Sequence, residues 1–232
     1  HTARLLADAR SILFITGAGV SADSGLPTYR GIGGLYEDAD TDEGLPIEEV
    51  LSGPMLARRP ELVWRHIASI EAVCRGVQPN RAHQVIAQLE RRRERVVTLT
   101  QNVDGLHGTA GAEQVIEIHG NIHTLRCTGC DRTRAVQDYA GLALPPRCGR
   151  CAAVERPEVV LFGELLPPAA VARLQDELDE GFELVVSVGT SSLFPYIAGP
   201  VFDAARRGTP TVEINPGETV VSGVVDVRLT TG

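Results

Sequence analysis

The chain has 232 residues, of which 43% are hydrophobic and 22% charged, and its formal net charge at pH 7 is −8. These proportions are typical of globular proteins and exclude collagen-like, coiled-coil and disordered chains. All 22 basic residues are arginine, so Schiff-base chemistry and a Walker-A phosphate loop are excluded. The acidic balance also argues against broad nucleic-acid binding, which needs a basic surface.

The hydrophobic pattern predicts helices and buried strands that alternate along most of the chain. In chain order we predict a helix over 2–10, a strand over 12–15, a loop with short helical pieces over 31–54, helices over 60–75 and 81–93, strands over 96–100, 115–118 and 158–162, a helix over 167–180, a strand over 184–188, a helix over 199–207 and a strand over 211–214. This alternation favours an α/β fold with a doubly wound parallel sheet. No apolar run approaches the length of a membrane span and no signal peptide opens the chain, so we expect a cytoplasmic protein without membrane association.

A glycine-rich turn, GAGVSA at residues 17–22, directly follows the first predicted strand. The pattern G-x-G-x-x-G/A lets backbone amides approach a pyrophosphate at the start of a helix. A dehydrogenase would also carry an acidic residue about 20 positions later, at the end of a second strand, and a polar loop stands there instead. A dehydrogenase therefore fits poorly, and a glycine turn without ligand remains the alternative.

Four cysteines form the strongest single pattern in the sequence. Cys127, Cys130, Cys148 and Cys151 make two Cys-x-x-Cys pairs separated by 17 residues. This spacing favours a tetrahedral zinc site with no open ligand position, so the zinc would be structural. Two disulfides are the alternative. Cys74 lies outside the cluster, and we expect it to be a buried free thiol.

Polar residues follow two of the predicted strands. Gln101, Asn102, Asp104 and His107 come after strand 96–100, and His119 comes after strand 115–118. Ligands of α/β proteins bind beyond the carboxyl ends of such strands. His119 is a candidate general base.

Several of these features have a structural alternative. A histidine buried in the core accounts equally for His107, and we expect His66, His83 and His123 to be structural or exposed. The segment 158–164 is either an exposed strand edge that captures a peptide or an ordinary buried strand.

Seven motifs together resemble the sirtuin family of NAD-dependent protein deacylases. They are GAGVSADSGLPTYRG, TQNVDGLH, IHGN, the four-cysteine cluster, VVLFGE, VGTSS and EIN, in family order over residues 14–215. The resemblance implies a Rossmann-like domain formed by 1–30, 76–123 and 158–232. It also implies a cofactor-binding loop and helical segment over 31–75 and a zinc module over 124–157.

The resemblance also implies the roles of individual residues. His119 would be the general base, and Asn102 would be catalytic on the nicotinamide side. Residues that would bind NAD are Gly17, Ala18, Gly19, Ser21, Arg30, Gln101, Asn102, Asp104, Gly189, Thr190, Ser191 and Asn215. The acyl-lysine peptide would add as a strand to Val160, Leu161, Phe162 and Gly163. The products would be nicotinamide, O-acyl-ADP-ribose and free lysine.

One departure from the family pattern bears on the acyl group. Residues 27–30 (PTYR) resemble the branch that removes succinyl and malonyl groups, which holds the acyl carboxylate with a Tyr-x-x-Arg pair. Alignment on Val63 and Trp64 places Ile67 and Ile70 at those two positions. A carboxylate buried there without a partner would cost about 2–5 kcal/mol, so we expect a preference for acetyl or longer neutral acyl groups.

Two other functions remain as alternatives. The chain could transfer mono-ADP-ribose to a protein, or it could be a non-enzymatic binding module whose zinc knuckles serve a protein partner. The presence of Asn102, Asp104 and His119 favours deacylation. The sequence leaves the oligomeric state and the target proteins open.

Overall fold

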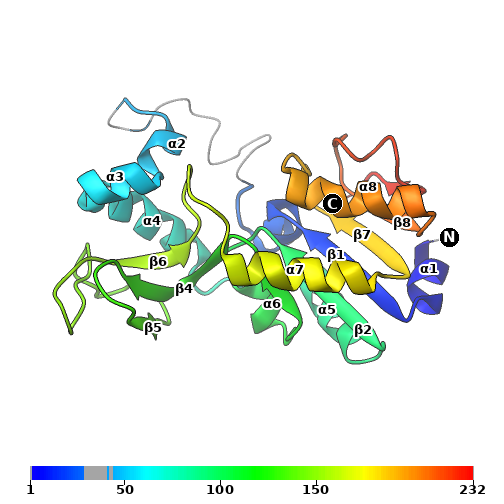
Figure 1. Cartoon of the computed structure of the whole chain (residues 1–232), viewed down its shortest axis with the longest axis horizontal. Helices are drawn as coiled ribbons and strands as arrows, with labels where there is room; N and C mark the ends of the chain where they lie inside the picture. Colours follow the sequence, from blue (N-terminus) through cyan, green and yellow to red (C-terminus); the bar gives the residue numbers. More distant parts are fainter. Residues whose placement is uncertain (1, 29–40, 42–43, 232) are drawn as a thin grey trace.

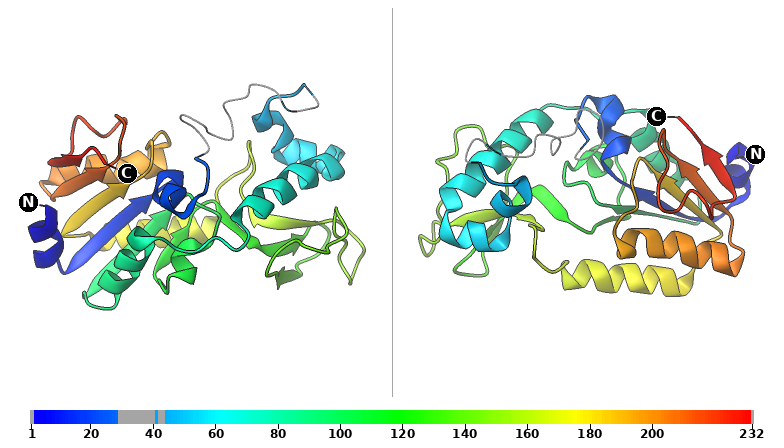
Figure 2. Two further views of the ribbon diagram at one scale, coloured as in Figure 1. Left: turned by 180° about the vertical axis from the view of Figure 1, so that it is seen from behind. Right: turned by 90° about the horizontal axis from the view of Figure 1, so that it is seen from above.

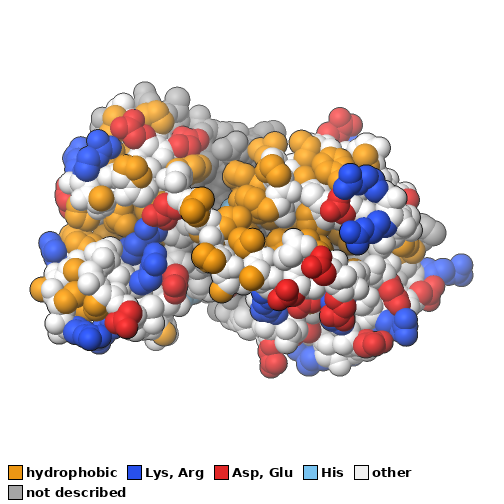
Figure 3. Space-filling model, in the orientation of Figure 1, with side chains coloured by type: hydrophobic (Ala, Val, Ile, Leu, Met, Phe, Trp, Pro, Cys, Tyr) orange, Lys and Arg blue, Asp and Glu red, His pale blue; other side chains and the backbone are white. Residues whose placement is uncertain are grey.

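The structure, a computed structural model, describes residues 2–28, 41 and 44–231. They form a large lobe around a six-stranded sheet and a smaller lobe around a three-stranded sheet (Figure 1). Figure 2 shows the same two lobes from behind and from above. Hydrophobic side chains gather between the lobes on the face seen in Figure 3. None of the helices in these described residues is long and apolar enough to cross a lipid bilayer.

The large sheet is parallel throughout, as predicted. Its strands are β1 (Ser11–Thr16), β2 (Arg95–Thr100), β3 (Val115–Glu117), β7 (Leu184–Val188), β8 (Thr211–Ile214) and β9 (Val227–Leu229). They lie in the order β3-β2-β1-β7-β8-β9. This is the strand order of dinucleotide-binding sheets, in which the winding reverses between the first strand and its neighbour. The reversal here lies between β1 and β7.

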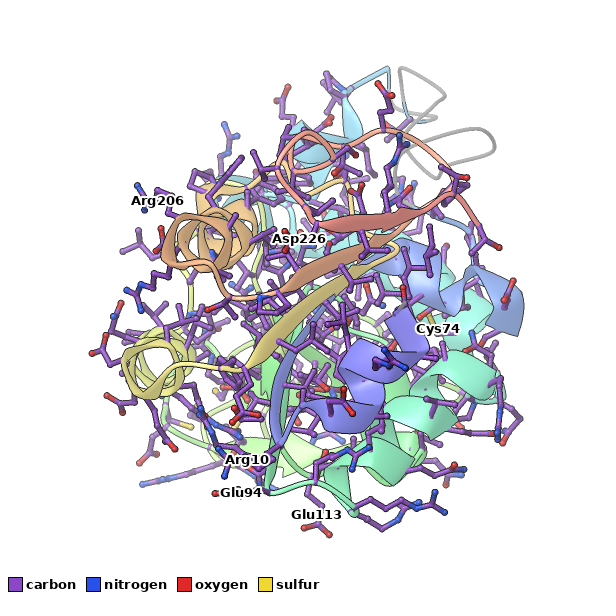
Figure 4. The ribbon with its side chains drawn as sticks, turned by 90° about the vertical axis from the view of Figure 1, so that its right-hand side faces the viewer. Arg10, Cys74, Glu94, Glu113, Arg206 and Asp226 are labelled. Carbon is purple, nitrogen blue, oxygen red and sulfur yellow. The ribbon has the colours of Figure 1, made fainter. Side chains whose placement is uncertain are left out.

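Helices cover both faces of this sheet (Figure 4). Helices α1 (Thr2–Asp8) and α5 (Arg81–Glu90) lie on one face, and α7 (Pro168–Glu180) and α8 (Pro195–Arg207) lie on the other. Alternate residues of β1 point to opposite faces, so Leu13 and Ile15 join the core under α7 and α8 while Ile12 and Phe14 join the core under α1 and α5. Burial on both faces explains why these strands are continuous apolar runs.

The smaller lobe joins the helical segment to the cysteine module. Its antiparallel sheet contains β4 (Gly120–Cys127), β5 (Thr133–Ala135) and β6 (Glu155–Val159), and its helices are α2 (Ile47–Val50), α3 (Gly53–Arg58) and α4 (Pro60–Cys74). The fully buried indole of Trp64 on α4 donates a hydrogen bond to the carbonyl of Glu155 at 2.9 Å and contacts the ring of Tyr139. The two segments therefore share one hydrophobic cluster.

Two predicted elements differ from the structure. The strand predicted over 158–162 is instead Glu155–Val159 in the smaller sheet, because Glu158 and Val159 pair with the start of β4. Residues beyond it leave the ladder, since the N–H of Phe162 donates to the carbonyl of Leu51. The helix predicted from residue 199 begins at Pro195, which occupies the first turn, and Pro200 is accepted inside it.

Two glycines offer a matched test of this packing. Gly189 has φ +59°, and a Cβ there would lie 2.3 Å from the backbone nitrogen of Val20. A Cβ on Gly199, inside α8, would meet nothing within 4 Å. We predict that Gly189→Ala lowers the free energy of unfolding by about 2 kcal/mol or more, whereas Gly199→Ala raises it by roughly 0.5–1 kcal/mol. Urea unfolding of the two zinc-loaded variants measures both changes in the free energy of unfolding. Equal midpoint urea concentrations for the two variants would contradict the close contact at Gly189.

Candidate functional site

Two glycine turns meet where the winding of the large sheet reverses. The N–H of Gly17 donates to the carbonyl of Val188 at 3.3 Å, and the N–H of Gly19 donates to the carbonyl of Gly189 at 2.8 Å. A Cβ on Gly19 would lie 2.7 Å from both the oxygen and the Cα of Gly189. Only glycine allows this approach, which brings the short helix η1 (Ala18–Ser24) to the carboxyl ends of β1 and β7.

Asn102 lies buried directly after β2 and connects to this turn. Its Nδ2 donates to the carbonyl of Gly17 and to the hydroxyl of Ser21, both at 3.1 Å. The hydroxyl of Ser21 donates to Asp104 at 2.8 Å, and the other carboxylate oxygen of Asp104 accepts the N–H of Leu106 at the start of α6 (Leu106–Thr109). The structure therefore brings together these four predicted residues.

Thr190 joins the ends of three strands. Its hydroxyl accepts from the Gln101 amide at 2.7 Å, and its carbonyl accepts from the Asn215 amide at 3.0 Å. Ser191 is exposed beside it. Ser192 was not predicted, yet it is fully buried and its hydroxyl has no partner within the described residues.

The two nitrogens of His119 have different partners. The N–H at Nδ1 donates to the carbonyl of Gln101 at 3.1 Å, and Nε2 lies 2.7 Å from the hydroxyl of Tyr196. Burial lowers the pKa of His119 below its ordinary value, although the Gln101 carbonyl opposes this shift. The ring is therefore neutral at pH 7, with its lone pair on Nε2, which is the form that a general base requires. The partnership with Tyr196 was not predicted.

Two further histidines lie beneath the site. His107 Nε2 lies 2.9 Å from the hydroxyl of Thr16, and burial lowers the pKa of His107 to about 3, so it stays neutral. His83 is fully buried, with Nδ1 3.0 Å from the side-chain oxygen of Asn80 and Nε2 3.5 Å from the Ser21 hydroxyl. His107 is thus a buried core residue. The contact of His83 with Ser21 was missed, and the Asn80 cap of α5 three residues earlier is the signal that could have indicated it.

A pocket opens between η1, α4 and the segment after β2. Its lining residues are Ala18, Ser21, Leu26, Pro27, Ile70, Val73, Cys74, Asn102, Val103 and Asp104. Ile70 lines this pocket and packs against the hydrophobic cluster of the smaller lobe, whereas Ile67 is buried within that cluster. Contact of either residue with an acyl group stays a prediction. Cys74 is only half-buried, and desolvation raises its pKa to about 11, so the thiol stays protonated. Arg30 lies outside the described residues.

The predicted peptide-binding segment 160–163 is anchored to its own chain. The N–H groups of Val160 and Phe162 donate to the carbonyls of His119 and Leu51, each at 2.9 Å. The N–H of Leu161 donates at 2.9 Å to Glu164, which Arg156 holds with both guanidinium ends. These three N–H groups are therefore not open to an added strand, and the binding of a peptide at 160–163 stays a prediction. Gly163 is exposed.

The four predicted zinc ligands come together in the smaller lobe. The sulfur atoms of Cys127, Cys130, Cys148 and Cys151 all lie within 4.8 Å of one another. The pairs Cys127–Cys151 and Cys130–Cys148 are separated by 3.4 and 3.8 Å. These distances exclude disulfide bonds and match the spacing of about 3.8 Å between sulfurs in a tetrahedral zinc site. The cluster therefore fits a structural zinc ion.

Comparison with known proteins gives one consistent result. A sequence model of the Sir2 family matches residues 17–194. A Pseudomonas aeruginosa protein named NAD-dependent protein deacylase 2 is 48% identical over 231 residues, covering 98% of this chain and 90% of the relative. A crystal structure of a Sir2 homologue with NAD has a TM-score of 0.88 at 35% identity, covering 99% of this chain and 88% of that chain. A structure of a Sir2 histidine variant with deacetylated p53 peptide and 3′-O-acetyl ADP-ribose has a TM-score of 0.85 at 29% identity. The match covers 98% of this chain and 90% of that chain.

Two cysteine variants test the metal site. We predict that Cys130→Ser loses bound zinc and destabilises the smaller lobe by several kcal/mol, because three thiolates hold the ion less tightly than four. Because Cys74 lies outside the cluster, we expect the variant Cys74→Ser to keep about one zinc ion per chain. Metal analysis by mass spectrometry and thermal unfolding measure both effects, and equal zinc contents in the two variants would contradict the assignment.

Proposed function

Because this chain belongs to the Sir2 family, we propose that it is an NAD-dependent enzyme that removes acyl groups from lysine side chains of proteins. The products are nicotinamide, O-acyl-ADP-ribose and free lysine. One observation carries the proposal: a neutral His119, with its lone pair on Nε2, shares a site with Asn102 and with the glycine turns between β1 and β7.

The residues at the sheet reversal fit NAD. Gly17 and Gly19 have no side chain and Ala18 has only a methyl group, so a pyrophosphate could approach the backbone at the start of η1. The buried Ser192 hydroxyl lacks a partner within the described residues, as expected beside a polar ligand. When bound, NAD supplies an activated ribose that accepts the acyl group and releases nicotinamide.

The other predicted cofactor residues would contact two further parts of NAD. Asn102, Ser21 and Asp104 would hold the nicotinamide side, and Asn215 with Ser191 would hold the adenosine ribose. Gln101, Thr190 and Gly189 fix the backbone between these two ends. Arg30 would complete the set.

His119 performs the proton transfer. The Gln101 carbonyl accepts from Nδ1, so the tautomer is fixed and Nε2 is free of hydrogen. Nε2 then takes a proton from a sugar hydroxyl. The zinc ion takes no part in this step, because four thiolates leave it no open position.

The acyl-lysine peptide would bind between the lobes, beside residues 160–163. Since the N–H groups of 160–162 are already bonded, the peptide would pair with the remaining backbone groups of Val160 and Gly163. The net charge of −8 favours lysine-containing segments over nucleic acid. Thiols that serve as zinc ligands are typical of a reducing compartment, which supports a cytoplasmic location.

The reaction products test this function against its two alternatives. We predict that incubation with NAD and an acetyl-lysine peptide yields nicotinamide and O-acetyl-ADP-ribose, measured by mass spectrometry. His119→Ala should lower the rate at least about 10²-fold, because the base is removed. Nicotinamide with ADP-ribosylated protein would indicate ADP-ribosyl transfer instead, and no nicotinamide release would indicate a binding module.

Two residues of α4 support a preference for neutral acyl groups. Ile67 and Ile70 align with the Tyr-x-x-Arg pair of the branch that removes succinyl and malonyl groups, and both are apolar. Neither side chain can pair with a carboxylate, so burial of a succinyl group beside them is unfavourable.

We therefore predict that kcat/KM falls at least about tenfold from acetyl-lysine to succinyl-lysine peptides, because Ile67 and Ile70 offer the carboxylate no cationic partner. Myristoyl-lysine serves as a neutral, longer comparison. The variant Ile70→Arg should narrow the gap in kcat/KM between acetyl and succinyl substrates, because Ile70 lines the pocket whereas Ile67 is buried in the core. A wild-type preference for succinyl over acetyl would contradict the proposal.

A further inference from the structure

Tyr196 occupies the nitrogen of His119 that proton transfer requires. Because the Gln101 carbonyl can only accept, Nδ1 of His119 carries the hydrogen and Nε2 is the acceptor. The hydroxyl of Tyr196, 2.7 Å from Nε2, must therefore be the donor. Both ring nitrogens are satisfied within the chain.

This contact conflicts with catalysis. Nε2 of a neutral imidazole has one lone pair in the plane of the ring, so it accepts one strong hydrogen bond at a time. A ribose hydroxyl that gives its proton to Nε2 has to donate to the same lone pair. The two hydroxyls therefore compete for one atom.

We propose that Tyr196 is a positioning residue that holds His119 neutral and correctly oriented before substrate binds, and that it must release Nε2 to the ribose hydroxyl for the reaction to proceed. This inference rests on the proposed function only for the identity of the competing hydroxyl. The contact between Tyr196 and His119 stands independently of it.

The position of Tyr196 suits a side chain that moves. It is the second residue of α8, and its ring stacks on that of Phe194 with centroids 5.3 Å apart. Phe194 is 41% exposed and its neighbour Leu193 is 52% exposed, so the stacked pair lies at the surface end of the site. The centroids of both rings lie 5.9 Å from that of the His119 ring, in T-shaped arrangements. The ring of Tyr196 itself is partly buried against the core under α7 and α8.

Proton loss from Tyr196 does not resolve the competition. Burial raises the pKa of Tyr196 to about 12, so its hydroxyl remains a donor across the physiological range. Within the described residues, His119 forms hydrogen bonds with Gln101 and Tyr196 and ring contacts with Phe194 and Tyr196. None of these three residues is charged at neutral pH. The hydroxyl of Tyr196 is therefore the group through which a single substitution should change the pKa of His119.

The variant Tyr196→Phe tests the proposal because it keeps the stacked ring and removes only the hydroxyl. A donor to Nε2 stabilises the neutral ring, so its removal should raise the pKa of His119 by about half a unit or more. NMR titration of the histidine ring in the protein without substrate measures this shift, with the His119 signal assigned from its absence in His119→Gln. Tyr139→Phe is the matched control, since the Tyr139 hydroxyl donates to the carbonyl of Ile122 in the smaller lobe. It should leave the pKa of His119 unchanged.

Kinetics then distinguish competition from a proton relay through Tyr196. Competition predicts that kcat/KM for NAD in Tyr196→Phe exceeds the wild-type value, by up to about tenfold, at pH values above the acid limb of the pH–rate profile. It also predicts that this acid limb moves to higher pH. A proton relay through Tyr196 predicts that kcat/KM for NAD falls at least about tenfold in Tyr196→Phe, and this result would overturn the proposal. An unchanged pKa of His119 would also overturn it, whether or not the enzyme deacylates. An absence of deacylation combined with a shifted pKa would instead count against the proposed function alone.

Discussion

The contact between Gly19 and Gly189 is the constraint on which the site depends. A 2.8 Å hydrogen bond joins their backbones, and a Cβ on either residue would lie within 2.7 Å of the other turn. The contact holds the turns after β1 and β7 together at the point where the sheet reverses its winding. From there, Thr190 positions Gln101 and Asn215 through hydrogen bonds, and the Gly17 carbonyl positions Asn102.

His119 lies where the two lobes meet, and both lobes hold it. Its ring is bonded to Gln101 of the large lobe, while its carbonyl accepts the N–H of Val160, which follows β6. Strand β4 begins at the next residue, Gly120, where a Cβ would lie 1.8 Å from the Glu158 carbonyl. Strand β4 ends at Cys127 of the cysteine cluster, so one strand connects the residue after His119 to the expected zinc site. The cluster itself lies apart from His119, in the smaller lobe.

Local patterns predicted most of the fold, and distant contacts account for what they missed. Strands β1, β2 and β7 are buried on both faces, so their short runs of apolar residues were enough to identify them. The zinc site was predicted because a Cys-x-x-Cys pair brings two sulfur atoms close together through the local chain alone. The contact of Tyr196 with His119 spans 77 residues and depends on how α8 crosses the sheet end. Likewise, Ile67 and Ile70 share one helix face, yet only the packing of α4 into the hydrophobic cluster of the smaller lobe decides that Ile67 belongs to the core.

None of the 232 residues is lysine, so this acyl-lysine enzyme has no lysine side chain in these residues that could be acylated or deacylated. The central claim, that the glycine turns and His119 form one NAD site, is tested most directly by a crystal structure with NAD and an acetyl-lysine peptide. The account predicts a pyrophosphate against Gly17–Gly19 and a nicotinamide-ribose hydroxyl within hydrogen-bond distance of His119 Nε2, with the Tyr196 hydroxyl displaced. A dinucleotide bound away from the β1–β7 turns, or a ribose remote from His119, would contradict it.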